Sequence, residues 1–270
     1  MLDVLVDTGS QKSLEGILCD GTNTNVGWKN GLFVLVEREL ERQLVLLGCS
    51  LHGNELDLRH LFTDLDGAGT TGPDSFGGAI GKATLQCQPV VEFDPLECKN
   101  EQIPDEVVRD LSRDQKLLYK YAFAISKDHL EESLVRQKVI AVNHSRWLTL
   151  AVRIMILYTR TEMPSDELKT IVIYILQVYA PTWFLIRREN DFTRGPAILH
   201  RKMQLVMEQL ESVQEGIKPV IQRNGWQAEP GTMLCAMLSS DNQQHRSKAV
   251  DLLTKFRNDP KIKSKSNVRI

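Results

Sequence analysis

The sequence predicts an α/β segment followed by a predominantly α-helical region. Short apolar runs alternate with helical patterns over residues 1–66, and a stretch rich in glycine and proline occupies residues 67–103. Helical periodicity then covers almost all of residues 104–257. Strand, helix, strand and helix in succession are typical of α/β proteins. We therefore divide the 270 residues into an α/β segment, an irregular linker, a helical domain and a basic, disordered tail at 258–270.

Two short apolar runs are the predicted strands of the first segment. Residues 16–19 stop at Asp20 and a Gly/Asn-rich turn, and residues 44–47 form a second buried run. Runs of this length bounded by turn residues indicate strands. Charged residues at helical spacing predict a helix over 28–42 between them, and residues 51–62 predict another.

Proline residues punctuate the helical region. Pro104 suits the first position of a helix, where its missing N–H costs nothing. Pro181 and Pro219 predict breaks, because proline inside a helix removes a hydrogen bond. The expected helices cover 145–160, 165–178, 198–215 and 243–257.

Composition and targeting signals limit the class of protein. Hydrophobic residues make up 42% and charged residues 25%, as in globular proteins with a packed core. The five cysteines are scattered and no secretory pattern opens the chain, so we expect a nuclear or cytoplasmic protein that is not secreted. The longest apolar stretch, 171–186, contains Gln177 and Pro181 and is shorter than the roughly 20 residues of a spanning helix. We expect no membrane partner.

Charge is distributed unevenly along the chain. Residues 1–135 contain 12 basic and 23 acidic residues, a net charge of −11, whereas residues 136–270 contain 21 and 12, a net charge of +9. This asymmetry predicts either a second half that faces a polyanion such as DNA or a contact between the acidic and basic halves.

Asp20 is the first residue with a chemical interpretation. A carboxylate at the carboxyl end of a buried strand lies where open α/β sheets bind ligands. With further acidic groups it would hold Mg²⁺, which prefers oxygen ligands. The alternative is an Asx turn, in which the carboxylate accepts hydrogen bonds from the following residues.

Cys49 and His52 form a C-x2-H motif after the second predicted strand. Structural zinc requires four ligands, and the spacing of Cys87 and Cys98 does not match a zinc knuckle. We interpret the motif as a strand-to-helix corner and assign no metal to it.

Arg146 and Trp147 open the longest apolar helix. Arg146, Arg153 and Arg160 recur every seven residues and form a basic stripe suited to phosphate. The alternative is a solvated face that pairs with the acidic half. Trp147 shares its helical face with aliphatic residues, which predicts that it packs in the core.

The order of these motifs resembles the middle of hAT-superfamily DNA transposases, over roughly residues 15–160. In that family the aspartate is one of three acidic residues on an RNase H-like fold that bind two divalent metal ions. An Arg-Trp pair begins a large helical insertion near the DNA. The segment Val-Tyr-Ala-Pro-x-Trp-Phe at 178–184 is most similar to transposon-derived proteins of invertebrates. The matching residues are Asp20 for the second acidic position, Cys49 and His52 for the C-x2-H, and Arg146 and Trp147 for the Arg-Trp pair.

The chain departs from the family at its other acidic positions. Nineteen residues precede Asp20, and Asp3 and Asp7 lie too close to it to hold the intervening hairpins. A final glutamate after the helical insertion is not recognisable. The resemblance therefore implies a partial RNase H-like fold with a mixed sheet and an incomplete acidic triad. Mg²⁺ would bind only if the triad were complete.

We consider three functions. The first is a transposase-derived, catalytically incomplete protein that binds nucleic acid through Arg146, Trp147, Arg153 and Arg160. The second is a helical module that binds protein partners through residues 104–257 without nucleic acid. The third is an active metal-dependent nuclease or transposase, which requires two more carboxylates beside Asp20.

Overall fold

A computed structural model shows a mostly helical protein, with 65% helix and 3% strand. The predicted helical region is therefore confirmed, and the α/β segment contains a small two-stranded parallel sheet. The residues described by the structure are 2–27, 29–67, 77–86, 88–141, 146–189, 194–223, 234 and 236–258. The basic tail after residue 258 lies outside them.

The chain divides into two compact units. Unit 1 comprises Met1–Gly53 and Ile221–Ile270, and unit 2 comprises Asn54–Val220. These boundaries fall within helices α4 (Ser50–Asp66) and α13 (Glu211–Arg223), not at the predicted boundaries after residues 66 and 103.

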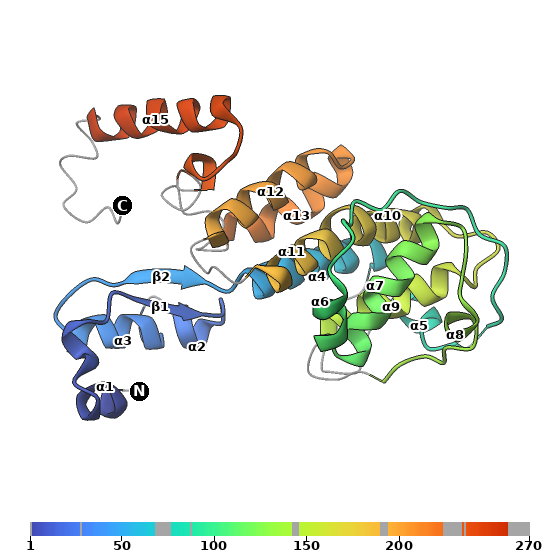
Figure 1. The fold of residues 1–270 in the computed structure, drawn as a ribbon, viewed down its shortest axis with the longest axis horizontal. Helices are drawn as coiled ribbons and strands as arrows, with labels where there is room; N and C mark the ends of the chain where they lie inside the picture. Colours follow the sequence, from blue (N-terminus) through green and yellow to red (C-terminus); the bar gives the residue numbers. More distant parts are fainter. Residues whose placement is uncertain are drawn as a thin grey trace. The chain divides into compact units, whose positions relative to one another are not determined.

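Unit 1 contains the sheet, drawn in blue in Figure 1. Strands β1 (Gly16–Cys19) and β2 (Val45–Gly48) are parallel, and Gly16 is paired with Val45. Both predicted strands are therefore confirmed to within one residue. The other elements of this unit are α1 (Leu2–Asp7), a 3₁₀ turn (Ser10–Lys12), α2 (Asn23–Val26), α3 (Leu32–Glu39) and α15 (Gln243–Asn258).

A small apolar core holds α3 against the sheet. Ile17 of β1 packs with Phe33 and Val36 of α3 and with Leu44, which precedes β2. Partly buried side chains, including Leu46, complete the cluster. This packing explains the connection between the strands, because a parallel pair requires a crossover and a helix is the usual one.

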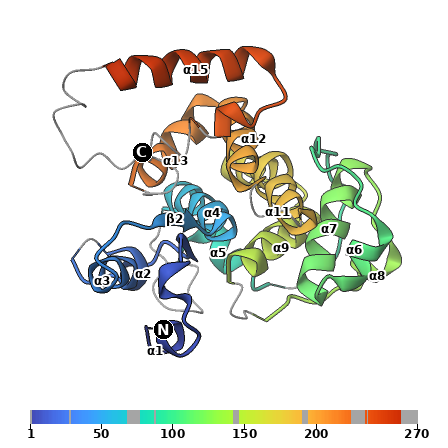
Figure 2. The ribbon, with the colours of Figure 1, turned by 60° about the vertical axis from the view of Figure 1, so that its left-hand side comes forward.

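Unit 2 is a bundle of helices. Helix α7 packs against α9, and α9 packs against α10. Figures 1 and 2 both show α7 beside α9. Its elements after α4 are α5 (Ala79–Ala83), α6 (Asp105–Asp110), α7 (Arg113–Ser126), α8 (Glu132–Val135), α9 (Arg146–Tyr158), α10 (Asp166–Tyr174), the π-helix η2 (Ile175–Tyr179), α11 (Ala180–Arg188), α12 (Gly195–Met207) and α13.

Helix α9 is the centre of unit 2. From Trp147 to Tyr158 every side chain except that of Leu157 is buried. A helix that is apolar on all sides belongs in the middle of a bundle. The predicted helix over 145–160 is thus confirmed, but the helix is buried on more sides than an amphipathic surface helix would be.

The predicted break at Pro181 is wrong, because the helix continues from α10 through η2 into α11. In a π-turn each N–H donates to the carbonyl five residues earlier, so Pro181, which lacks an N–H, leaves the Leu176 carbonyl without its intrahelical donor. The Lys99 N–H donates to that carbonyl at 3.1 Å. A segment distant in sequence therefore supplies the hydrogen bond that proline removes.

The predicted break at Pro219 is also wrong, and the predicted helix over 198–215 is two helices. Helix α13 continues past Pro219. Pro219 and Glu215 are both exposed, so solvent can reach the carbonyl that loses its donor. Between α12 and α13 the Gln214 side chain donates to the carbonyls of Met207 and Gln209, at 3.2 and 2.8 Å, which stabilises the turn.

By length and composition alone, the continuous helix Asp166–Arg188 is apolar enough to cross a membrane. In the structure 61% of its apolar window is buried inside the protein. The core helix of a packed bundle has the same length and composition, so this feature does not identify a membrane segment.

Residues 88–104 form an extended segment that lies along unit 2. The Val91 N–H donates to the Thr159 carbonyl at 3.1 Å. The Tyr158 hydroxyl donates to the Asp94 carbonyl at 2.7 Å. Within the predicted linker, residues 79–83 form the short helix α5, whereas residues 88–103 are irregular, as expected, and are held to the bundle by specific hydrogen bonds.

Candidate functional site

The parallel sheet brings Asp20, Cys49 and His52 to one edge. Cys19 is paired with Gly48, so the residues that follow the two strands emerge side by side. The Cys49 N–H donates to the Cys19 carbonyl at 2.9 Å and extends the pairing to the start of α4. The carboxyl edge of a parallel sheet is where such folds bind ligands.

The Asp20 carboxylate is held by its own turn. One oxygen, Oδ1, accepts hydrogen bonds from the Thr22 N–H at 3.1 Å, the Thr22 hydroxyl at 2.6 Å and the Asn25 amide at 2.7 Å. The Thr22 hydroxyl is the main cause that lowers the pKa of Asp20, and His52 contributes a smaller lowering. Of the two interpretations of Asp20, the structure shows the Asx turn.

The neighbouring thiol Cys19 is not an activated nucleophile. Burial raises its pKa first, and the nearby Asp20 and Cys49 raise it further. A raised pKa reduces the thiolate fraction at neutral pH, and the thiolate is the reactive form. Within the described part of the chain, no group of three His, Cys, Asp or Glu side chains could hold a metal ion.

The arginines of the predicted stripe face the interior. Arg153 is 5% exposed and its Nε donates to the Ile140 carbonyl at 2.8 Å. Arg160 is 7% exposed and donates to the Gln137 carbonyl at 2.5 Å. The expectation of an open basic stripe is therefore wrong at these two positions, because backbone carbonyls of the segment after α8 occupy the guanidinium groups. Their role in binding nucleic acid stays a prediction.

Trp147 is a core residue, as predicted. Its side chain is 7% exposed, and the Arg59 guanidinium lies 5.7 Å from its ring centroid. A cation over the face of an indole ring is attracted by the ring quadrupole. The Arg146 side chain and residues 142–145 lie outside the described part of the structure.

Sequence reasoning missed a buried ion pair in unit 2. The Lys202 ammonium on α12 pairs with the Asp57 carboxylate on α4, and their side chains are 3% and 0% exposed. On the same helix the buried Asn54 amide donates to the Tyr179 carbonyl at 2.9 Å. The sequence signal was a helical face on which polar residues share the spacing of apolar ones. This face carries Asn54, Asp57, Leu58 and Leu61, so it could have indicated that the two polar side chains are buried.

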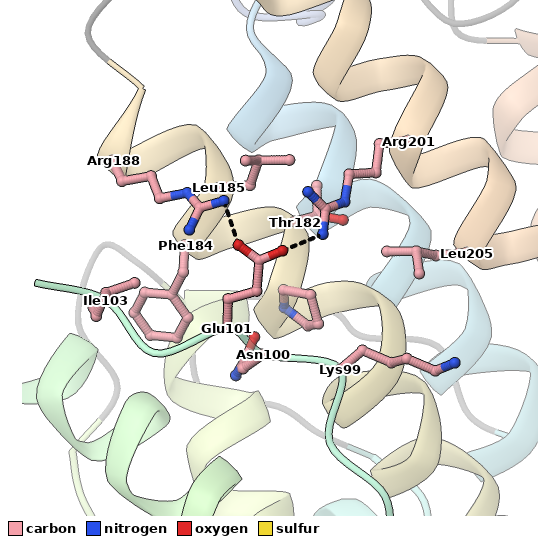
Figure 3. A pocket seen from close by; sticks show the side chains of 11 residues that line it. Lys99, Asn100, Glu101, Ile103, Thr182, Phe184, Leu185, Arg188, Arg201 and Leu205 are labelled. Atoms are coloured by element: carbon pink, nitrogen blue, oxygen red, sulfur yellow. Dashed lines mark hydrogen bonds and ion pairs between the residues drawn. The ribbon is translucent and has the colours of Figure 1, made fainter. Parts of the chain in front are cut away.

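A second ion-pair group was also unforeseen. Figure 3 shows Glu101 of the extended segment between Arg188 of α11 and Arg201 of α12, at 2.7 and 2.8 Å. Hydrogen bonding to Arg201, followed by that to Arg188, lowers the pKa of Glu101. The cavity beside them has a volume of about 20 Å³, enough for a single water molecule. The group fastens the extended segment to the bundle.

Comparison of the chain with family models, with curated proteins and with solved structures gives no match. The resemblance to hAT transposases therefore depends on the order of the motifs in the sequence. Asp20, Cys49 and His52 are residues of the matched motifs that the structure brings to one edge of the sheet.

Proposed function

We propose that this protein is derived from a transposase, retains part of an RNase H-like fold, lacks strand-transfer activity and acts by binding nucleic acid. The carrying observation is that Asp20 and the C-x2-H of Cys49 and His52 meet at the carboxyl edge of a parallel strand pair. The resemblance matches Asp20 to the family's second acidic position and Cys49 with His52 to its C-x2-H.

The order of the elements after the sheet also supports the proposal. The C-x2-H leads into α4, and Arg146 is the first residue of α9 in a large helical unit. This is the sequence of strand, C-x2-H helix and Arg-Trp helix that the resemblance implies. The sheet has two strands in the described residues, so the mixed sheet of an RNase H-like fold is part of the proposal.

The catalytic part of the proposal depends on the surroundings of Asp20. Two-metal catalysis requires several carboxylates that hold both ions on one side of the scissile bond. Thr22 and Asn25 already donate three hydrogen bonds to Oδ1 of Asp20. This oxygen stabilises the turn after β1. We propose that Asp20 is the remnant of a metal-binding carboxylate and now has a structural role.

The experiment is a pair of assays on the whole chain. Labelled duplex and single-stranded DNA are titrated at several salt concentrations, and cleavage is followed with Mg²⁺ or Mn²⁺. We expect binding whose logarithm falls linearly with the logarithm of salt concentration, and no cleavage. Cleavage that disappears in Asp20→Asn would contradict the catalytic part. Failure to bind any DNA at low salt would contradict the binding part.

A helical protein-interaction module is the second candidate, and one observation favours it. Met207 and Leu210, around the turn between α12 and α13, are 69% and 66% exposed. Neighbouring exposed apolar side chains are a feature of protein-binding surfaces. Binding of a protein partner that is lost in Met207→Ser/Leu210→Ser, with DNA affinity absent from the start, would favour this alternative.

A further inference from the structure

Unit 2 has an open groove of about 620 Å³ along helix α7, which is drawn in green in Figure 1. Ligand pockets for small molecules and nucleotide-sized groups have volumes of this order. Its wall includes parts of α6 and α8 and the residue Gln102. The residues that carry the inference are Arg109, Lys116, Tyr119, Lys120, Phe123 and Lys127.

One face of α7 forms this groove. At 100° per residue, the side chains from Lys116 to Lys127 that line it fall within roughly 140° of the helix circumference. The opposite face of α7 is buried in the bundle through Leu118, Tyr121 and Ile125. Packing of that apolar face therefore fixes the direction in which the polar face points.

The lining of the groove has an excess of positive charge. Four cationic side chains and His129 line it, and Glu131 is the one acidic residue of the lining. Glu131 pairs with Lys120 at 3.0 Å, and Arg109 pairs with Glu106 of its own helix at 3.9 Å. The Lys116 ammonium donates to the Arg109 carbonyl at 2.9 Å, a contact that leaves its positive charge uncompensated. The surrounding half of the chain has a net charge of −11, so this concentration of cations is local.

Two aromatic rings lie among these cations. Tyr119 and Phe123 are half-buried and meet edge to face with centroids 4.8 Å apart. Tyr119 is held from behind by Phe184 at 5.4 Å, and its hydroxyl accepts the Ile103 N–H at 3.4 Å. The Lys127 ammonium lies 5.8 Å from the Phe123 centroid. These contacts hold the two rings in place, so little side-chain entropy is lost when a ligand binds to them.

From this combination we infer that the α7 groove binds single-stranded nucleic acid. Proteins that bind single strands combine a basic groove, which follows the phosphates, with aromatic rings on which bases stack. Lys116, Lys120 and Lys127 would face the phosphates, and Tyr119 with Phe123 would contact a base. In a duplex the bases are stacked on one another and are not available to the rings. The inference rests on the proposed nucleic-acid binding and assigns it to α7.

The test is fluorescence anisotropy of the full chain with labelled oligo-dT and with a duplex of the same length, over a salt series. The groove variant is Lys116→Gln/Lys120→Gln/Lys127→Gln. Its matched control is Lys82→Gln/Lys138→Gln/Lys218→Gln, which removes three exposed lysines of the same unit. We expect the groove variant to flatten the salt dependence for oligo-dT by up to about two units, and the control to behave as wild type.

A second variant tests the aromatic contact. Phe123→Leu keeps an apolar side chain beside Tyr119, and we expect it to weaken oligo-dT binding on the order of tenfold without changing the salt slope. Polyglutamate, inorganic phosphate and free dTMP are added as competitors. We expect dTMP to compete more strongly than phosphate, and polyglutamate to compete weakly.

The outcomes separate this inference from the broader proposal. If wild type binds oligo-dT and neither the triple variant nor Phe123→Leu weakens binding, nucleic acid binds elsewhere and the α7 assignment is wrong. Equal competition by polyglutamate would show a general polyanion site and would also overturn it. If wild type binds no nucleic acid at low salt, the proposed function fails together with this inference. Unchanged thermal unfolding shows that each variant is folded.

Discussion

The β1–β2 edge of unit 1 and helix α9 of unit 2 use charged side chains in opposite ways. At the sheet edge, Asp20 takes its hydrogen bonds from Thr22 and Asn25, both within five residues of it. Arg153 on α9 and Arg160, two residues after its end, donate to the carbonyls of Ile140 and Gln137, which are 13 and 23 residues away in sequence. One site is local and solvated, whereas the other depends on tertiary packing and is buried.

This difference shows what Arg153 and Arg160 do in the folded protein. The segment from Leu134 to Ile140 crosses the bundle with little regular structure, so its carbonyls need donors. Arg160, Arg153 and Tyr121, whose hydroxyl donates to the Leu134 carbonyl at 3.0 Å, supply them. A stripe that resembles a phosphate site in sequence is thus a set of donors for an irregular segment.

The largest effect is expected at Trp147, at the start of the buried helix. Trp147→Ala should lower the free energy of unfolding by about 3–5 kcal/mol, because it leaves a cavity and removes the contact with Arg59. Urea denaturation measures this value, and Trp147→Phe, which refills most of the space, is the control. A variant of unchanged stability that has lost DNA affinity would instead favour a direct contact of the indole with DNA.

The buried Lys202–Asp57 ion pair of unit 2, like Arg153 and Arg160, should contribute to stability through a partner from a distant segment. Lys202→Met should cost about 3 kcal/mol in unfolding free energy, because Asp57 keeps a charge that is no longer compensated in the interior. The double variant Asp57→Leu/Lys202→Met should recover most of this loss, since an apolar pair carries no desolvation penalty. Lys218→Met, at an exposed lysine of α13, is the control. No recovery in the double variant would contradict this account.

Arg153 provides the direct test of the buried arginine. Arg153→Met removes the donor to Ile140 and should cost about 1–3 kcal/mol, the range for a buried polar group left without its partner. The comparison is with Arg136→Met, whose exposed guanidinium pairs with Glu132 and should matter little. Equal, small effects of both substitutions would show that Arg153 is not held in the interior.

Asp20 should give the smallest effect on stability. Asp20→Asn should cost less than about 1 kcal/mol, because the hydrogen bonds are local and solvent screens the charge. The folded-state pKa of Asp20 is lowered, so its contribution is present above the ordinary carboxyl range and is lost as the pH falls through the lowered value. Urea denaturation from pH 7 to pH 3 should show the two proteins converging. Asp3→Asn is the control, and a difference that grows on acidification would contradict the lowered pKa.

A chemical test probes how firmly the extended segment 88–104 is held to unit 2. Burial raises the pKa of Cys98 to about 11, so on the order of one in a thousand of its thiols is ionised at pH 8. We expect iodoacetamide to modify Cys98 far more slowly than a free cysteine in a peptide, as mass spectrometry of digested protein would show. Urea should abolish this protection, and rapid modification in the native state would show that residues 88–104 are not held to the bundle.

Features governed by residues close in sequence could be predicted from the chain alone. Residues 16–19 and 44–47 are strands because apolar runs of that length bounded by turn residues have few alternatives. The turn after Asp20 and the burial of Trp147 follow from side-chain type and periodicity. In each case the pattern that predicts the feature lies within a few residues or along one helical face, even though the pairing of the strands and the contact of Trp147 with Arg59 join distant residues.

Other features depended on contacts between distant segments. Pro181 does not break its helix because Lys99, 82 residues away, donates to the Leu176 carbonyl. Arg153 and Lys202 are buried because carbonyls and a carboxylate from other elements meet them in the interior. The periodicity of a charged residue states which face it occupies, not whether another segment will cover that face. Whether a basic side chain meets solvent or a buried acceptor is settled when the segments pack, since desolvation is tolerated only where a partner is already in place.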